Sequence, residues 1–190
     1  MNHSSIMEGT MASLNSPVSS HLVWVLFLLR FTCWFLLWTF CEYWMHRLMH
    51  VSSPYNILYR MHRSHHLTPY AVLTDKKYRW PKLSYFIFFF DNIHETLEII
   101  VGETIPALCI YYCDPECGIL LLAFHYVYEI LATDSLLEHN PDISLHSVIK
   151  YCAVGQFHLE HHRLPSYNYG FTITLWDHVF KTYKYPSKTI

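Results

Sequence analysis

Charge is scarce in this sequence of 190 residues: 15% are Asp, Glu, Lys or Arg, whereas 52% are hydrophobic. Soluble domains carry roughly 25% charged residues, so this composition disfavours an ordinary soluble protein. The formal net charge is −2, which lacks the basic excess that a nucleic-acid-binding surface requires. The abundance of apolar and aromatic residues also excludes disorder for most of the chain.

Several motifs that indicate a particular metal site or catalytic mechanism are also absent. The six cysteines form no CxxC pair, which disfavours a cysteine zinc site. A disulfide between Cys113 and Cys117 stays open. There is no HExxH motif, which a zinc hydrolase needs for its general base. The Glu-x-x-His motif of carboxylate-rich di-iron bundles is also absent.

Long apolar segments account for the low charge. Residues 22–40 contain one charged residue, Arg30, and are long enough to cross a hydrocarbon layer of about 30 Å. An intramembrane arginine normally faces protein, so we expect Arg30 to pair with a buried acid. Residues 93–112 and 118–134, separated by a short polar break, predict a membrane-buried helical hairpin.

The remaining sequence completes a single membrane domain. Residues 1–21 are polar and serine-rich, which predicts a disordered tail before a membrane domain over 22–190. Of the 13 lysines and arginines, all except Arg30 fall within 47–82 and 150–188. Because positive loops stay cytoplasmic, segments 43–92 and 135–190 should be cytosolic. We therefore predict an all-α integral membrane bundle of three spans, with a cytosolic histidine-rich cap.

Histidine is the residue in excess, with 15 copies, and most lie in the two predicted cytosolic segments. They form one HxxxH pair, two HxxHH triplets and a further histidine near the second triplet. Residues three and four apart share a helix face, so each group can present several imidazoles to a metal. Nine ligands exceed the capacity of one ion and suit two, with adjacent histidines turning towards different ions. The nine predicted ligands are His46, His50, His62, His65, His66, His139, His158, His161 and His162.

The other histidines receive weaker predictions. His125 lies within an apolar segment and His146 follows His139 by seven residues, so either could assist the site. His94 and His178 are interpreted as structural. Imidazole ligands suit zinc, copper, iron and nickel, and spare histidines beside a bilayer favour iron and dioxygen chemistry on a lipid.

These histidine motifs, called histidine boxes, resemble those of the fatty acid hydroxylase/sterol desaturase superfamily. The resemblance covers about residues 22–186. The segment Glu42–His50 resembles the first box of the family, and Tyr59–His66 with the following Thr68–Ala71 resembles the second. The segment His158–His162, followed by Tyr167–Gly170 and Leu175–Asp177, is similar to the end of sterol carbon-5 desaturases.

The resemblance implies an enzyme and its partners. It implies a non-haem site of two iron ions held by the nine histidines, His139 matching least closely, with electrons from NAD(P)H through cytochrome b5. It also implies an endoplasmic reticulum membrane, O₂ as oxidant, and a lipid, favoured to be a sterol, that is desaturated or hydroxylated. Fatty acid hydroxylase and sterol 4-methyl oxidase remain alternatives. An inactive relative and a metal-transporting or metal-sensing membrane protein are the alternatives without this activity.

Overall fold

The computed structural model describes residues 17–67, 82–87, 89, 93–132, 137–140, 142–143 and 149–186. Within these ranges the chain is helical, and its only β-structure is one isolated bridge between Cys152 and Ile173. This confirms the predicted all-α class. The helices are α2 (Pro17–Met49), α3 (Ile57–His66), α4 (Ile93–Ile99), α5 (Ile105–Cys113), α6 (Pro115–Leu131), α7 (Gln156–Arg163) and α8 (Leu175–Val179), with short 3₁₀ turns at Leu83–Phe86 and Ile149–Tyr151 and a π-helical segment, η4, at Ile100–Thr104.

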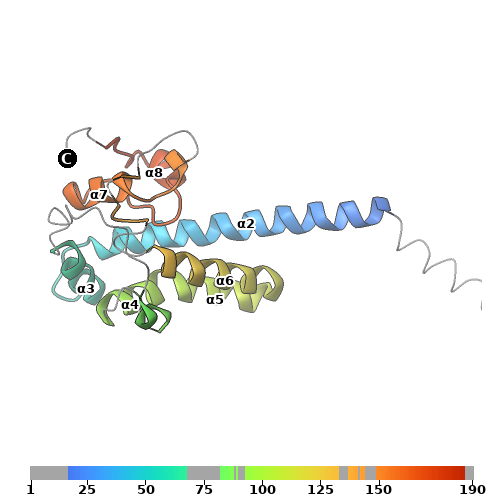
Figure 1. Cartoon of the computed structure of the whole chain (residues 1–190), viewed down its shortest axis with the longest axis horizontal. Helices are drawn as coiled ribbons and strands as arrows, with labels where there is room; N and C mark the ends of the chain where they lie inside the picture. The colour runs from blue at the N-terminus through green and yellow to red at the C-terminus, as the bar shows by residue number, and fades with distance from the viewer. Residues whose placement is uncertain are drawn as a thin grey trace, which may run out of the picture.

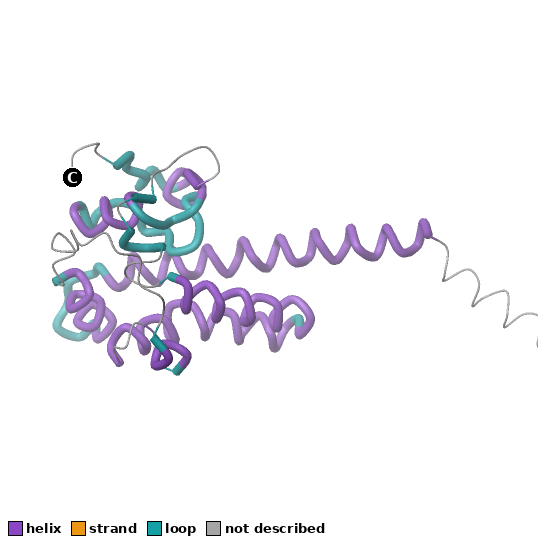
Figure 2. The backbone as a smooth tube through the Cα atoms, in the orientation of Figure 1, coloured by secondary structure: helices purple, strands orange, loops and turns teal. Residues whose placement is uncertain are grey.

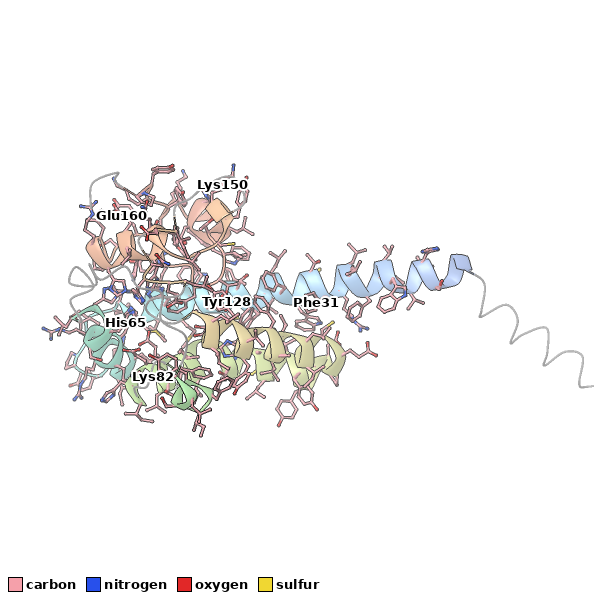
Figure 3. All side chains as sticks on the ribbon, in the orientation of Figure 1. Phe31, His65, Lys82, Tyr128, Lys150 and Glu160 are labelled. Carbon is pink, nitrogen blue, oxygen red and sulfur yellow. The ribbon has the colours of Figure 1, made fainter. Side chains whose placement is uncertain are left out.

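Helix α2 is the axis of the molecule (Figure 1). Its 33 residues extend for about 50 Å at 1.5 Å per residue, longer than a hydrocarbon layer of about 30 Å. The helix begins at Pro17, before the predicted start of the span at residue 22, and residues 1–16 of the predicted tail lie outside the described residues. Towards its N-terminus the apolar side chains of Leu22, Trp24 and Leu28 are exposed. Figure 3 shows that side chains project freely from this part of the helix.

The C-terminal half of α2 is different, because one face of it is buried. Trp38, Glu42, His46 and Met49 recur at helical spacing and are all 0% or 1% exposed. The helix therefore continues beyond the apolar run 22–40, and the polar residues of this extension lie buried inside the protein. This face carries the first histidine pair away from the apolar segment into the cap.

The predicted hairpin is confirmed. Helix α4, η4 and α5 follow one another directly over residues 93–113, and α6 returns antiparallel beside them (Figure 2). The Asp114 side chain accepts a hydrogen bond from the Cys117 amide at 3.2 Å, and Pro115 opens the helix. Trp38 of α2 packs against Ala107 of α5 and Leu121 of α6 in the apolar core.

Two helical stretches, Ser20–Met49 and Ile93–Cys113, are long and apolar enough to cross a membrane. The third predicted span, 118–134, corresponds to α6, which runs over Pro115–Leu131 and forms the shorter return arm of the hairpin. The structure thus contains two helices of spanning length within its described part.

Arg30 pairs with acids, as predicted, at the turn of the hairpin. Its guanidinium lies 2.9 Å from Asp114 Oδ2 and also contacts the Glu116 carboxylate. The prediction of a buried partner was wrong for Glu116, whose side chain is 75% exposed, and holds better for Asp114, at 12%. All six cysteines lie in the described ranges and are free, so the Cys113–Cys117 disulfide is not formed.

Helices α3, α4, α7 and α8 gather around the C-terminal end of α2 (Figure 1). Trp176 of α8 donates from its indole nitrogen to Thr39 Oγ1 at 3.0 Å, which fixes α8 to α2. Phe157 of α7 is fully buried against Ala153 and Tyr183. The described parts of the two positively charged segments, 47–67 and 150–186, therefore meet at one end of the long helix.

Candidate metal centre

The nine predicted histidines come together as two groups in the cap. In each group the facing ring nitrogens all lie within 4.8 Å of one another. The first cluster contains His46, His50, His62, His66 and His161; the second contains His65, His139, His158 and His162.

The first cluster has the spacing of ligands around one ion. Its Nε2 atoms are 3.1 Å apart between His46 and His62, 3.0 Å between His50 and His161, and 3.1 Å between His161 and His66. Imidazole nitrogens bound 2.0–2.1 Å from one metal lie about 2.8–3.4 Å from each other, for right-angled to tetrahedral arrangements. The five rings thus fit a shared cation.

The second cluster repeats this spacing. His162 Nε2 lies 3.0 Å from both His139 Nε2 and His158 Nε2. The His65 ring centroid lies 4.7 Å from that of His162 and 5.2 Å from that of His139. His65 therefore closes a four-imidazole group, which has the donor number of a tetrahedral site.

Helical spacing explains how each HxxHH triplet serves both clusters. On α3, His62 and His66 lie four residues apart and face the first cluster, whereas His65 turns to the second. On α7, His158 and His162 face the second cluster and His161 the first. The expectation that adjacent histidines turn towards different groups agrees with this geometry.

Hydrogen bonds on the outer ring nitrogens aim the first cluster inward. His46 Nδ1 donates to the Tyr169 carbonyl oxygen at 2.8 Å, and His161 Nδ1 donates to the Tyr167 carbonyl oxygen at 2.6 Å. A carbonyl can only accept, so the proton of each ring resides on Nδ1. The Nε2 lone pair is left to face the cluster, which is the tautomer that metal ligation requires.

The segment Tyr167–Gly170, which supplies these carbonyls, is held by Asp177. Its carboxylate accepts hydrogen bonds from the Tyr169 and Gly170 amides, both at 2.8 Å. Asn168 adopts a positive φ of 59°, and its side chain bonds the backbone of Phe157 and Lys184. The motif that suggested a sterol desaturase on sequence thus has a positioning role in this structure.

Burial keeps the histidines neutral. Desolvation, then neighbouring imidazoles, lowers the pKa of His50 to about 4 and of His66 to about 3. The same causes hold the pKa of His158 and His161 well below the ordinary value. Neutral rings have free lone pairs at physiological pH, so the donor set fits divalent cations, including iron and zinc.

Sequence reasoning missed the carboxylates of α4. Glu98 Oε1 lies 2.5 Å from His62 Nδ1, and Glu95 Oε1 lies 3.8 Å from His65 Nδ1. A carboxylate on the outer nitrogen of a histidine orients the ring and raises its basicity. The i, i+3 spacing of Glu95 and Glu98 on one helix face was the available signal, but only the fold brings α4 beside α3.

The other polar residues near the clusters have different surroundings. Glu160, between His158 and His161, belongs to neither histidine cluster and pairs with Arg163 at 2.6 Å. His178 stacks on Tyr183 with ring centroids 4.0 Å apart, which agrees with a structural role. His146 lies outside the described residues. His125 belongs to neither histidine cluster and faces two glutamates.

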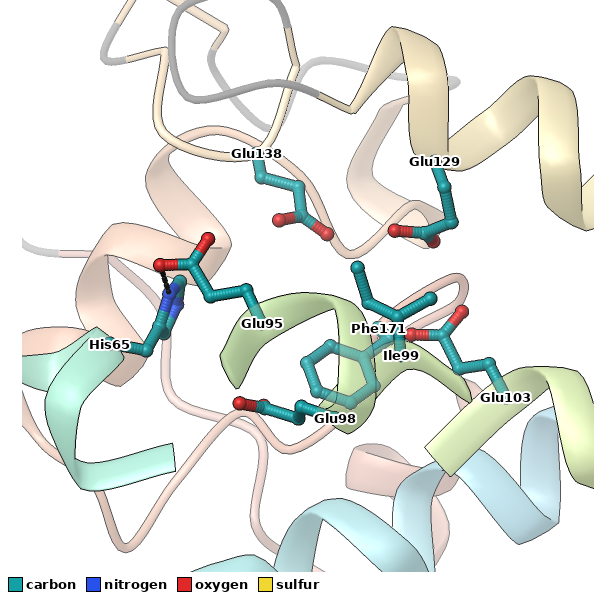
Figure 4. A pocket seen from close by; sticks show the side chains of 8 residues that line it. All are labelled: His65, Glu95, Glu98, Ile99, Glu103, Glu129, Glu138 and Phe171. Carbon is teal, nitrogen blue, oxygen red and sulfur yellow. Dashed lines mark ion pairs between the residues drawn. The ribbon is translucent and has the colours of Figure 1, made fainter. Parts of the chain in front are cut away.

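A cavity of about 30 Å³ adjoins the second cluster (Figure 4). This volume accommodates a water molecule. Its wall is mostly acidic, with two apolar residues and one ligand candidate. The lining residues are His65, Glu95, Glu98, Ile99, Glu103, Glu129, Glu138 and Phe171.

Spanning helices that end in two histidine clusters define the class: a helical membrane protein with a candidate metal centre at one end of its membrane helices. The chain belongs to the fatty acid hydroxylase family, whose model matches residues 31–182. The match includes all nine clustered histidines and begins one residue after Arg30. It confirms the family resemblance predicted from the three boxes.

One curated relative is the methylsterol monooxygenase erg25A of Aspergillus fumigatus. It is 26% identical over 153 residues, which cover 80% of this chain and 46% of that protein. The chain therefore spans about half the length of this relative. No solved structure matches the chain.

Proposed function

We propose that the chain is a membrane-bound di-iron oxidoreductase that uses O₂ to hydroxylate or desaturate a lipid, with a sterol as the substrate class. The observation that carries the proposal is the division of nine histidines into two adjacent clusters at the cap end of the long helix α2. Family membership and similarity to a methylsterol monooxygenase support the reaction class and the sterol.

The residues present fit two divalent ions. His46, His50, His62, His66 and His161 would hold one, and His65, His139, His158 and His162 the other. Iron bound in these sites would supply the redox chemistry that activates O₂ towards an unactivated C–H bond. Hydroxylation consumes O₂, two electrons and two protons for each oxygen atom inserted, the second oxygen leaving as water.

The protein's own residues bind, orient and shield. The Tyr167 and Tyr169 carbonyls and the Glu98 carboxylate hold three ligand rings in place, which fixes the centre before substrate arrives. The buried ring of Phe171 stacks on His46 with centroids 4.1 Å apart and helps to exclude water. The exposed apolar helices give a lipid substrate direct access from the bilayer.

We further propose that the cap faces the cytosol from an endoplasmic reticulum membrane and receives electrons from NAD(P)H through cytochrome b5. The positive residues at the cap end support this orientation, since positively charged segments are retained in the cytosol. Arg30, the exception, is neutralised by Asp114 and Glu116 at the hairpin turn.

The test is metal analysis and lipid profiling of the full chain expressed in membranes. The expected result is two irons per chain and a new hydroxyl or double bond in a sterol when an electron donor is supplied. His161→Ala, in the first cluster, and His162→Ala, in the second, should each abolish the product. His178→Ala is the matched control, because it removes a histidine outside both clusters and should leave the product unchanged.

Two results would overturn parts of this proposal. Absence of bound iron together with unaltered lipids, in the presence of an electron donor, would refute the oxidoreductase. A modified fatty acyl chain with unchanged sterols would refute the sterol and support a fatty acid hydroxylase.

A further inference from the structure

A third group of metal-ligating side chains lies outside both histidine clusters. Glu103 comes from η4, and His125 and Glu129 come from α6, one helical turn apart. Each side chain is at most 4% exposed, and one ligand atom from each lies within 4.8 Å of the other two. The hairpin therefore gathers two carboxylates and one imidazole in its interior.

The carboxyl groups of Glu103 and Glu129 interact with each other, but the atoms that face His125 Nδ1 are not hydrogen-bonded to it. His125 Nδ1 lies 3.3 Å from Glu103 Oε2 and 3.9 Å from Glu129 Oε1. Neither contact has hydrogen-bond alignment, and all three atoms are buried polar atoms without a hydrogen-bond partner. Such atoms are costly in a protein interior, so three of them aimed at one point indicate a missing partner.

The opposite nitrogen of the imidazole is already engaged. Thr104 Oγ1 lies 2.9 Å from His125 Nε2. When Nε2 donates to this hydroxyl, the Nδ1 lone pair is presented to the two carboxylates. An outer hydrogen bond that fixes the ring in this way accompanies most metal-bound histidines.

The donor set of the group suits a cation. Among the described residues, the ion pairs of Glu103 and Glu129 are with His125 alone. The buried carboxyl group of Glu42 interacts electrostatically with both. Buried ionised carboxylates are stable only when a counter-charge compensates for their lost hydration.

The backbone is specially shaped at this point. Residues 100–104 form a π-helical segment, and Pro106 follows in the first turn of α5. Proline removes an amide donor and clashes with the carbonyl four residues earlier, here that of Gly102. The widened turn places Glu103 and Thr104 towards α6, and π-helical insertions are frequent at functional sites.

We propose that Glu103, His125 and Glu129 form a third metal site, which binds a divalent transition ion such as Zn²⁺. A mixed nitrogen and oxygen donor set suits this class of ion. Ligand atoms held 2.0–2.2 Å from a tetrahedral ion lie about 3.3–3.6 Å from each other, close to the separations of 3.3 and 3.9 Å from Nδ1. The adjoining cavity, lined in part by Glu103 and Glu129, has room for a water as the fourth ligand.

This site shares no ligand with the histidine clusters, so it binds independently of them. Figure 4 places His65 and Glu95 at one side of the cavity and Glu103 and Glu129 at the other. An ion at this position would tie η4 to α6 and rigidify the hairpin against which the cap is built.

The test is equilibrium dialysis of the purified full chain, stripped with a chelator, against Zn²⁺. The wild type should bind three ions per chain, and Glu129→Gln and His125→Gln should each bind one fewer. Glu116→Gln, an exposed residue at the hairpin turn, is the matched control and should bind as many as the wild type. His158→Ala should lose an ion from the second cluster and retain the third site.

Folding of each variant is checked by its helical circular dichroism, and His125→Gln decides the result when Glu129→Gln does not fold. A folded variant of either residue that binds as many ions as the wild type overturns the proposal, whatever the total number of ions that the wild type binds. Failure of the histidine clusters to bind metal would be distinct, because the difference of one ion between wild type and Glu129→Gln would persist.

Discussion

The contact between Glu98 and His62 offers the sharpest test of how the protein holds its first cluster. Glu98 is 8% exposed, and its Oε1 lies 2.5 Å from His62 Nδ1. Glu98→Gln retains the shape and an acceptor oxygen but removes the negative charge. A hydrogen bond to a charged group contributes roughly 1.5–3 kcal/mol, against about 0.5–1.5 kcal/mol for a neutral one.

The difference, about 1–1.5 kcal/mol, corresponds to a loss in metal affinity of roughly tenfold, at the lower end of the 10–100-fold effects of outer-shell substitutions. The assay is the metal retained per chain after dialysis against a graded series of chelator concentrations. Glu95→Gln is the matched control on the same helix, because its carboxylate lies 3.8 Å from His65 Nδ1 and should matter less. Unchanged retention in Glu98→Gln, or an equal loss in Glu95→Gln, would refute this reasoning.

Three further perturbations test the cap and the hairpin. In the metal-stripped protein, lowering the pH from about 6.5 to 4 should reduce thermal stability. Histidines in the unfolded chain take up protons near pH 6.5, whereas in the folded protein the pKa of His50 is about 4 and that of His66 about 3. A melting temperature that does not change over this pH range would contradict the assigned burial. Gly170→Ala should destabilise the cap by about 1–3 kcal/mol and weaken metal retention, since a Cβ there would lie 2.3 Å from the Ile173 carbonyl oxygen; retention equal to wild type would argue against the positioning role of this segment. Trp38→Phe keeps a buried ring but removes an indole donor to a carbonyl of the hairpin at 3.0 Å, which should cost about 1–3 kcal/mol in chemical denaturation, and an unchanged midpoint would contradict it.

Local spacing explains why the ligand groups could be predicted from the sequence. Histidines three and four residues apart on α3 and α7 must share a helix face wherever those helices lie. The hairpin followed from two apolar runs separated by a polar break. The start of α6 at Pro115, three residues before the predicted start at residue 118, also has a local signal, because Asp114 followed by Pro115 is typical of a helix start.

The outer contacts could not be predicted, because they depend on tertiary placement. Glu98 reaches His62 across 36 positions and the Tyr169 carbonyl reaches His46 across 123, and no local pattern encodes such distances. Hydropathy also ended the first span at residue 40, whereas α2 continues to Met49. A hydropathy profile treats Glu42 and His46 as a helix end, although the protein buries both.

The division of each HxxHH triplet between two clusters constrains how this chain can change. Inserting or deleting one residue within α3 would rotate everything beyond it by about 100° around the helix axis. His62 would then part from His66, and His65 would leave the second cluster, so both centres would be lost in a single event. Substitutions around these triplets leave the helical spacing of the histidines unchanged, whereas an insertion or deletion within a triplet disrupts both clusters at once.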